Sequence, residues 1–400
     1  MKKMAVALLG DYFTSWMGGA NLLGSVLDAL LRAAPAQNAS VHLLMRHTNL
    51  PTSVQDGVTD FLPLRREQLN AGGPLKCLLD AAPQLEHVLF YRDLPATAQV
   101  LGLDVIGPTG ENLGADFPLP WAAYIPDFQH QHLPHFFTQR ERFGRDQQFR
   151  ALVENSWGVF VNSGAVLADI QRFYGAAANR QRLYRFPQIF SDVAAGWQDG
   201  QATRDRLGIT TPYVISCSQR WLHKQHELII TAFAEHLQAH PASPLRLVFT
   251  GERGDYRKAD YAQQIERLID HFQLRGRIHD LGLIDRHDQL QLIAGAQALV
   301  QASLFEGGPG ASGVLEAALL GVPVLSSDIE VNRELTFGAL QFFDRHRASS
   351  LAALLATLPL TAVERDPPYE ADHIDHLHAG GGLQLLASLR SLAAAGRRPA

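Results

Sequence analysis

Two glutamates and the glycine-rich loop between them form the segment of this sequence best suited to chemistry. Glu306 and Glu316 enclose four glycines, and the apolar run that follows is typical of a helix; the glycines are Gly307, Gly308, Gly310 and Gly313. Glycines let a backbone approach a ligand closely, and a helix N-terminus attracts anions. Carboxylates repel phosphate but accept hydrogen bonds from hydroxyl groups. The segment therefore predicts a site that holds phosphate beside hydroxyls, as in a nucleotide sugar.

Three histidines lie in a polar loop after the apolar run Ala122–Ile125. His130, His132 and His135 are of the residue type that most often binds metals. No nearby cysteine or further group of ligand residues supports them, and Pro134 interrupts a regular helix. We expect no metal site here, and three histidines without a common role remain the simple alternative.

Length and composition indicate a two-domain protein with a partner other than nucleic acid. A chain of 400 residues exceeds the usual size of one domain, and its formal net charge is −5. No segment offers the roughly 18 uncharged apolar residues that a membrane-spanning helix needs. Cys77 and Cys217 form neither a disulfide framework nor a metal motif, so we expect a reducing, cytoplasmic compartment. Peripheral contact with the inner face of a membrane stays open.

Short apolar runs alternate with amphipathic stretches of helix length, which predicts βαβ units and parallel sheets. The strands predicted in the first half are Met4–Leu9, Val41–Met45, Val88–Tyr91, Val105–Ile106, Ala122–Ile125 and Val159–Asn162. Those predicted in the second half are Tyr213–Cys217, Leu245–Thr250, Ile278–Leu281, Leu299–Gln301 and Val322–Ser326. The polar segment between the two series is the predicted linker.

The sequence thus predicts an α/β fold of two consecutive Rossmann-like domains. The expected ranges are 1–190 for the first domain, 191–211 for the linker, 212–380 for the second domain and 381–400 for a C-terminal helix and tail. The motifs follow strands directly, at the edge where doubly wound sheets bind ligands. We therefore expect motifs from both halves to face one cleft between the domains.

Gly18 and Gly19 open the first predicted helix. One interpretation is a backbone platform that approaches a diphosphate and an acceptor. The other is close packing between helix and strand. The pair is not part of a G-x-G-x-x-G signature, so a dinucleotide is only weakly indicated.

The glutamate loop resembles that of the retaining nucleotide-sugar glycosyltransferases of family 4, which have the GT-B fold. The family pattern is two glutamates with seven residues between them, followed by a Gly-x-Pro-Val strand entry. Here Glu306, Glu316-Ala317 and Gly321-Val322-Pro323-Val324 match its ends, but nine residues separate the glutamates. The extra two residues imply a changed path for the phosphate-binding loop.

The resemblance implies roles for individual residues. Glu316 binds the ribose hydroxyls and Glu306 contacts the donor sugar. The backbone from Gly307 to Gly313, including Ser312, holds the diphosphate, and Lys224 neutralises the departing diphosphate without a metal or other cofactor. The family usually has an arginine five residues before this lysine; position 219 is Gln, and the adjacent Arg220 is the substitute that we expect.

Two further segments resemble the family, and in part a subgroup that modifies bacterial surface polysaccharides. Gln219, Trp221, His223, Lys224 and His226 fit the subgroup's Gln-x-Trp-x-His-Lys-x-His pattern. The family usually has His-Asp after the strand corresponding to Ala122–Ile125. Here Pro126 replaces the histidine and Asp127 is retained, so His130 is the expected sugar contact beside Asp127.

The resemblance implies a retaining enzyme that moves a hexosyl unit from a nucleoside-diphosphate sugar to a hydroxyl of a glycan or glycolipid acceptor. The domain 1–190 binds the acceptor, 212–380 binds the donor, and a terminal helix over Leu383–Leu392 packs back on a domain. A nucleotide-sugar epimerase and a non-catalytic sugar-nucleotide-binding protein remain alternatives. The histidines His373, His376 and His378 receive no role and are expected on a solvated face.

Overall fold

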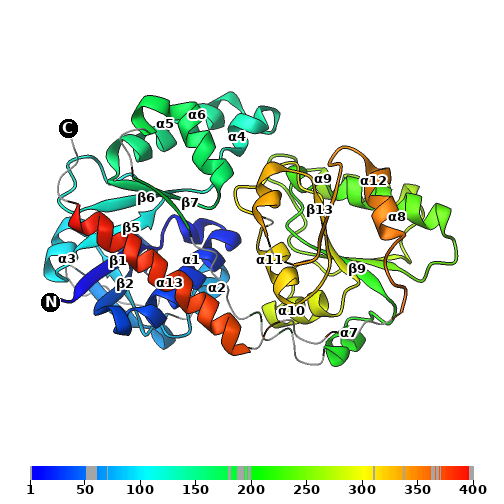
Figure 1. Cartoon of the computed structure of the whole chain (residues 1–400), viewed down its shortest axis with the longest axis horizontal. Helices are drawn as coiled ribbons and strands as arrows, with labels where there is room; N and C mark the ends of the chain where they lie inside the picture. The colour runs from blue at the N-terminus through cyan, green and yellow to red at the C-terminus, as the bar shows by residue number, and fades with distance from the viewer. Residues whose placement is uncertain are drawn as a thin grey trace. The chain divides into compact units, whose positions relative to one another are not determined.

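The computed structural model describes residues 2–50, 61–69, 71–178, 182–186, 200–309, 311–336, 338–361 and 371–395, and the single residues 193, 196, 365 and 369. The chain divides into two compact units (Figure 1). The first unit comprises Met1–Pro126, Phe143–Ser191 and Asp375–Ala400. The second comprises Asp127–Arg142 and Asp192–Ile374.

A predominantly parallel sheet forms the centre of the first unit. Its strand order in the described residues is β3-β4-β2-β1-β5-β6-β7-β8, and only β3 is antiparallel to its neighbour. The strands are β1 (Met4–Leu9), β2 (Ala39–Arg46), β3 (Phe61–Arg65), β4 (His87–Tyr91), β5 (Val105–Thr109), β6 (Trp121–Ile125), β7 (Gly158–Val161) and β8 (Arg182–Arg185). The helices are α1 (Met17–Ala33), α2 (Gly73–Ala81), α3 (Leu94–Val100), α5 (Gln139–Asn155), α6 (Gly164–Ala178) and the terminal α13 (Ala371–Ala394).

The second unit is a doubly wound sheet with all pairs parallel. Its order in the described residues is β11-β10-β9-β12-β13-β14, so the direction of winding reverses between β9 and β12. The strands are β9 (Tyr213–Cys217), β10 (Arg246–Thr250), β11 (Ile278–Asp280), β12 (Ala298–Gln301), β13 (Val324–Ser327) and β14 (Leu340–Phe343). The helices are α4 (Gln129–His132), α7 (Gln201–Arg206), α8 (His226–Ala239), α9 (Tyr261–His271), α10 (Arg286–Ala294), α11 (Ala311–Leu319) and α12 (Ala348–Leu355). Ligands of such sheets bind at the reversal, beyond the strand ends.

The predicted fold class is confirmed, and so is every strand that the sequence predicts, within two residues at most ends. Three strands were not predicted: β3, β8 and β14, which each have a strand neighbour on one side only. Only one residue of β3 and one of β14 is buried, and none of β8. Such edge strands lack the continuous apolar run by which the central strands are found.

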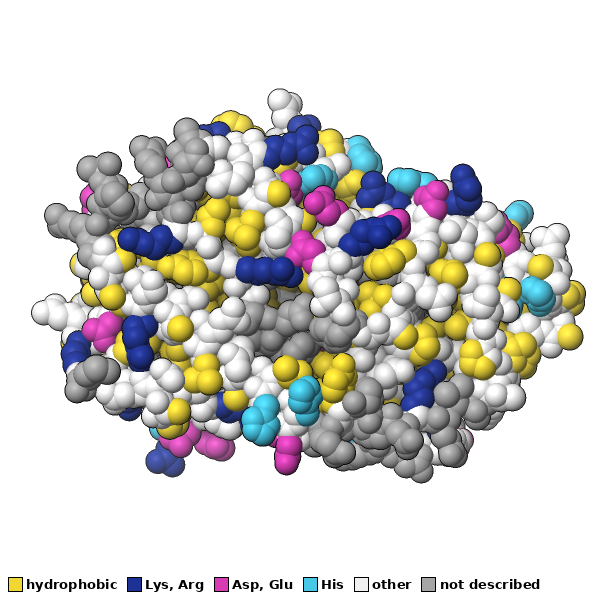
Figure 2. Space-filling view, viewed as in Figure 1, with side chains coloured by type: hydrophobic (Ala, Val, Ile, Leu, Met, Phe, Trp, Pro, Cys, Tyr) yellow, Lys and Arg dark blue, Asp and Glu magenta, His cyan; other side chains and the backbone are white. Residues whose placement is uncertain are grey.

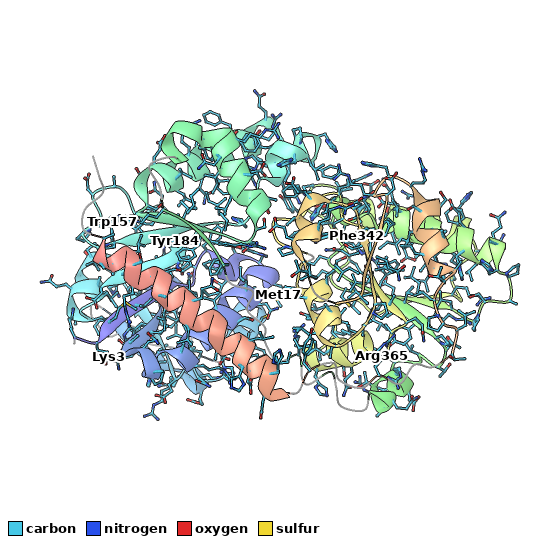
Figure 3. All side chains as sticks on the ribbon, viewed as in Figure 1. Lys3, Met17, Trp157, Tyr184, Phe342 and Arg365 are labelled. Carbon is cyan, nitrogen blue, oxygen red and sulfur yellow. The ribbon has the colours of Figure 1, made fainter. Side chains whose placement is uncertain are left out.

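The C-terminal helix belongs to the core of the first unit. Leu385, Leu386, Leu389 and Leu392 are buried there with residues of α1, and Figure 1 shows α13 (red) lying along this unit. Trp157 and Tyr184, labelled in Figure 3 near the end of α13, pack against the same core. The expected terminal helix was Leu383–Leu392, but α13 begins at Ala371.

The earlier start of α13 brings His378 into the interior. Its Nε2 lies 3.0 Å from Oδ2 of Asp28 on α1, and both side chains are buried. Asp28 also accepts a hydrogen bond from Arg32 at 2.7 Å. Burial opposes ionisation, but the hydrogen bonds from His378 and Arg32 outweigh it and lower the pKa of Asp28. The expected solvated face therefore holds for His373 and His376, which are exposed, and not for His378.

Two glycines of α13 provide a matched test of this packing. A Cβ at Gly382 would overlap the carbonyl oxygen of Ala29, whereas a Cβ at Gly380 would meet nothing within 4 Å. We expect Gly382→Ala to lower the free energy of unfolding by about 1–3 kcal/mol through overpacking. Gly380→Ala should raise it by about 0.5–1 kcal/mol because alanine favours the helix. Denaturant titration of both variants checks the account, and equal effects would contradict it.

Candidate functional site

A short turn after β9 presents Lys224. Residues Leu222–Lys224 form a 3-10 turn, and the backbone N–H of Leu222 donates to Oδ2 of Asp255 at 2.9 Å. Gln225 follows in the left-handed conformation at φ 47°, and its side-chain amide donates to the carbonyl oxygens of Ala302 and Arg345, both at 3.0 Å. The turn before α8 is thus fixed to the loop after β12, across the reversal of the sheet.

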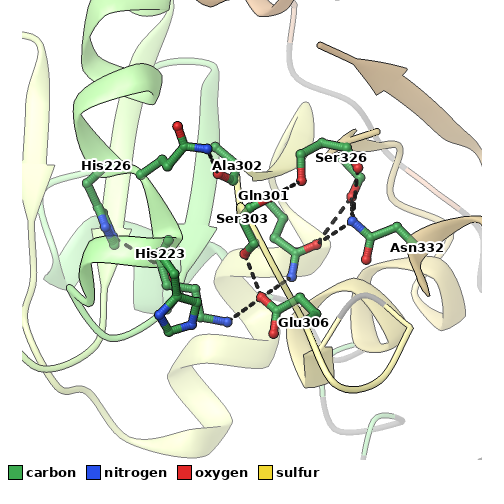
Figure 4. A network of polar contacts seen from close by, with 12 residues as sticks. His223, His226, Gln301, Ala302, Ser303, Glu306, Ser326 and Asn332 are labelled. Carbon is green, nitrogen blue, oxygen red and sulfur yellow. Dashed lines mark hydrogen bonds and ion pairs between the residues drawn. The ribbon is translucent and has the colours of Figure 1, made fainter. Parts of the chain in front are cut away.

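Lys224 and Glu306 form an ion pair at this reversal (Figure 4). Their side chains are 12% and 10% exposed, so both are largely removed from water. Oε1 of Glu306 also accepts hydrogen bonds from Gln301 at 3.1 Å and from Ser303 at 2.5 Å. Two residues that the sequence predicted for the donor site therefore meet, although 82 positions separate them.

A second layer of polar contacts orients Gln301, whose role was not predicted. The hydroxyl of Ser326 donates to Oε1 of Gln301 at 3.2 Å, and Asn332 donates to Ser326 at 2.8 Å (Figure 4). All three side chains are buried. A polar side chain at the end of a buried strand, as Gln301 is at the end of β12, is the signal by which it could have been found.

The glycine-rich loop leads into α11, which begins at Ala311. Gly307 and Gly308 are half-buried, Gly310 lies outside the described residues, and of Ser312 only the backbone is described. A Cβ at Gly313 would lie 3.6 Å from Cβ of Cys217, so the start of α11 packs against the end of β9. Beside it is a cavity of about 20 Å³, which is enough for roughly one water molecule and is lined in part by Lys224, Gln301 and Gly313.

Glu316 lies on α11 with one carboxylate oxygen unpaired. The residue is 4% exposed, and its Oε1 lies 2.8 Å from Nη1 of Arg286 at the start of α10. No group of the described residues donates a hydrogen bond to its buried Oε2. Buried carboxylate oxygens are almost always paired, so this atom is an acceptor in place for a ligand that donates, such as a hydroxyl.

Arg220 occupies a different position from the one predicted. Its side chain is 2% exposed and forms an ion pair with Asp280 at the end of β11, over the ring of Phe249. Arg253 also contacts Asp280, at 2.9 Å. The guanidinium of Arg220 thus pairs with the part-buried carboxylate of Asp280, while its buried Nη1 has no hydrogen-bond partner among the described residues. Its contact with the diphosphate stays a prediction.

The histidines near Lys224 are uncharged at neutral pH. Burial, together with the charges of Arg220 and Lys224, lowers the pKa of His226 to about 3. Burial, Lys224 and Arg257 hold the pKa of His223 well below its usual range. The two imidazoles therefore add no positive charge to this turn.

The segment after β6 belongs to the second unit and modifies two predictions. Asp127 accepts a hydrogen bond from the backbone N–H of Gln129 at 2.8 Å and is half-buried. His130 is fully buried, with ring contacts to Phe128 and Phe137, so it offers no surface for the predicted sugar contact. His132 instead stacks on Phe305, which directly precedes Glu306, with ring centroids 5.0 Å apart. The domain expected over 1–190 differs from the first unit here, since 127–142 packs with the second.

Gly18 and Gly19 are explained by packing within the first unit. A Cβ at Gly19 would lie 2.5 Å from the indole ring of Trp16 and 2.6 Å from the carbonyl oxygen of Phe13. A Cβ at Gly18 would lie 3.3 Å from Nε1 of Trp16. Glycine at these positions leaves room for the ring of Trp16. This supports close packing as the reason for the two glycines, rather than a platform for a diphosphate.

Three further features of the structure concern metal ions, membranes and surface charge. Among the described residues, no group of three or more His, Cys, Asp or Glu side chains is placed to hold a metal ion, and no helix is long and apolar enough to cross a membrane. On the face shown in Figure 2, basic and acidic side chains are interspersed.

The second unit matches a known family. The sequence profile of the family described as "Glycosyl transferases group 1" matches residues 200–358, which include Lys224, Glu306 and Glu316. No curated protein sequence matches the chain significantly.

Solved structures resemble the chain over nearly its whole length. Anabaena Alr3699/HepE, determined in complex with UDP and glucose, has a TM-score of 0.61 at 18% identity and covers 96% of this chain and 95% of its own. Sucrose-phosphate synthase from Thermosynechococcus elongatus has a TM-score of 0.60 at 17% identity, covering 98% and 96%. An α,α-trehalose-phosphate synthase (UDP-forming) from Burkholderia vietnamiensis has 0.60 at 14% identity, covering 99% and 100%.

The fold that these structures share with the chain is GT-B. The GT-B fold and the family match over residues 200–358 are consistent with each other and with a GT-B glycosyltransferase.

Proposed function

We propose that this protein is a retaining glycosyltransferase of family 4. It transfers a hexosyl unit from a nucleoside-diphosphate sugar to a sugar hydroxyl of a glycan or glycolipid acceptor, in the synthesis of a cell-surface polysaccharide. The reaction proceeds in the cytoplasm without a metal ion. The observation that carries the proposal is the buried, unpaired Oε2 of Glu316. Glu316 lies on the helix that follows the glycine loop, and this loop begins after Glu306, the partner of Lys224.

Each part of the site has a role in donor binding. Glu316 accepts hydrogen bonds from the ribose hydroxyls, and the N-terminus of α11 with the preceding glycines receives the diphosphate. Glu306 contacts the donor sugar, and Asp127 approaches the sugar from the segment after β6. Uridine is the base to test first, because Alr3699/HepE has been solved with UDP and with UDP-glucose.

Lys224 has the central role in the chemical step. The bond between the anomeric carbon and the diphosphate oxygen breaks, and negative charge develops on the leaving diphosphate. The ammonium group of Lys224 stabilises that charge, at a site where little water screens it. Oε1 of Glu306 already accepts contacts from Lys224, Gln301 and Ser303, so this oxygen is poorly placed to act as a nucleophile. We therefore infer attack of the acceptor hydroxyl on the same face, with its proton passing to the leaving phosphate.

Ligand-dependent thermal stability tests the donor site. We expect a UDP-, GDP- or dTDP-sugar to raise the melting temperature with the logarithm of its concentration. Glu316→Ala should weaken binding of the preferred nucleotide roughly 10- to 100-fold, since a hydrogen bond to a charged group contributes about 1.5–3 kcal/mol.

The matched control is Glu330→Ala, which removes an exposed glutamate of the same unit. It should leave nucleotide binding unchanged. The ligand-induced shift is compared, not the melting temperature itself, because loss of Glu316 also removes the partner of Arg286. A wild-type protein that no nucleotide stabilises would contradict the proposal.

A further inference from the structure

Three segments that are distant in the sequence meet at one buried ion pair, Asp255–Arg257. The side chains of Asp255 and Arg257 are 0% and 6% exposed, and Nη2 of Arg257 lies 2.7 Å from Oδ2 of Asp255. The pair lies in the loop between β10 and α9. None of the roles assigned so far to donor or acceptor explains why a loop should bury two opposite charges.

The carboxylate of Asp255 joins this loop to the turn that carries Lys224. Oδ1 accepts from the backbone N–H and Nε of Arg257, at 2.9 and 2.8 Å. Oδ2 accepts from Nη2 of Arg257 and from the backbone N–H of Leu222, at 2.7 and 2.9 Å. Leu222 is the first residue of the 3-10 turn that ends at Lys224, so Asp255 fixes where the turn begins.

The other side of the Arg257 guanidinium binds the segment after β6. Nη1 donates to Oε1 of Gln129 at 3.0 Å, and the guanidinium carbon lies 5.8 and 5.5 Å from the ring centroids of Phe136 and Phe137. The same carbon lies 5.8 Å from the ring of Trp221, next to the turn. A planar, permanently charged group is able to make these contacts at once, which a lysine is not.

We propose that Arg257, held by Asp255, is a positioning residue that orders the Lys224 turn and the segment 127–142 as one assembly. Asp255 fixes the turn, and Arg257 both neutralises Asp255 and attaches the segment through Gln129. The stacking of His132 on Phe305 adds a second attachment beside Glu306. The consequence for catalysis rests on the proposed function, because that function assigns Lys224 to the leaving group. The structural coupling between the turn and the segment is independent of the proposed function.

Hydrogen exchange of the full chain without ligand, followed by mass spectrometry, tests the coupling. In Arg257→Gln, peptides covering 221–225 and 128–137 should both exchange at least tenfold faster than in wild type, while peptides of β9, β10 and β12 stay protected. In Gln129→Ala, which removes only the attachment, acceleration is expected in 128–137 alone. Arg257→Lys keeps the charge beside Asp255. In this variant, the peptide covering 221–225 should exchange as slowly as in wild type, while the peptide covering 128–137 should exchange faster.

Arg275→Gln is the matched control, because Arg275 is ion-paired with Asp270 but 62% exposed. This control should change the exchange rate of neither peptide. Unchanged exchange of both peptides in Arg257→Gln overturns the proposal, and so does uniform acceleration across the second unit.

A turnover assay separates the proposed function from the proposed positioning role of Arg257. If wild type transfers sugar, Arg257→Gln should lower kcat at least tenfold with little change in KM for the donor. If wild type transfers none, the proposed function fails while the exchange result stands.

Discussion

Replacement of Lys224 by alanine is expected to lower kcat of sugar transfer by a factor of about 10²–10³, the usual effect of removing one group that stabilises transition-state charge. In the ligand-free protein, Lys224 is paired with Glu306. During the reaction, the diphosphate attracts the ammonium group of Lys224 more strongly than Glu306 does, because the negative charge of the diphosphate grows as its bond to the sugar breaks. Donor binding should weaken less than kcat falls, since this growth of charge occurs in the transition state.

The fold should tolerate the loss of Lys224. Gln301 and Ser303 still donate to Glu306, so the carboxylate keeps two hydrogen bonds. Lys224→Arg should recover part of the activity because the charge remains. Lys258→Ala removes a lysine that bonds Gln264 in the same unit and should leave turnover unchanged. Initial rates at saturating donor check these expectations, and a Lys224→Ala variant within threefold of wild type would remove Lys224 from the mechanism.

Replacement of Arg220 by methionine is expected to reduce stability without affecting donor binding. Breaking a buried ion pair by removing one partner costs about 3–5 kcal/mol, because a buried charge is left without compensation. Here the remaining charge is Asp280, whose contact with Arg253 places the cost toward the lower end of that range. Nucleotide affinity, measured well below the melting temperature, should change less than twofold.

Arg253→Met is the matched comparison, since Arg253 contacts the same Asp280 but is 52% exposed. Its loss should cost less than about 1 kcal/mol, as is usual for exposed ion pairs. Chemical denaturation gives the stability of both variants, and calorimetric titration with UDP gives the affinity. If Arg220→Met keeps its stability but binds nucleotide tenfold more weakly, the guanidinium of Arg220 contacts the diphosphate. The role of Arg220 as the partner of Asp280 is then wrong.

The sequence predicts the central strands well because buried parallel strands require continuous apolar runs. Met4–Leu9 and Tyr213–Cys217 were predicted with the bounds that the structure has. The edge strands β3 and β14 were missed because only one residue of each is buried, so neither has a continuous apolar run. The hydrophobic spacing of α13 contained a signal that was not used: His378 lies four residues after the buried Ile374 and seven before Leu385, on the same helical face.

The candidate site was predicted where its residues share a local motif. Glu306, Glu316 and Lys224 were predicted from the glycine loop and the strand exits, and their roles stay predictions. The structure brings Lys224 and Glu306 together. The pairing of Arg220 with Asp280 was not predicted, because the sequence does not show that these two residues, 60 positions apart, are partners. The burial of His130 beside Phe128 and Phe137 was not predicted, because it depends on packing that the local sequence does not reveal.

The contact between Arg257 and Gln129 lay beyond sequence reasoning for the same reason. The two residues are 128 positions apart, and neither stands in a motif whose spacing indicates the other. The role proposed for Arg257 follows from its distances to Asp255, Gln129 and the neighbouring rings.

Simultaneous measurement of the released nucleoside diphosphate and the glycosylated product tests the central claim most directly. The assay uses the sugar nucleotide that gives the largest thermal shift, together with a mixture of glycan and glycolipid acceptors. We predict that wild type forms both products in equal amounts and only when acceptor is present, and that Lys224→Ala forms neither at a comparable rate. Conversion of the donor to an isomeric sugar nucleotide without acceptor, or binding of the donor with no product at all, would contradict the assignment of this protein as a glycosyltransferase.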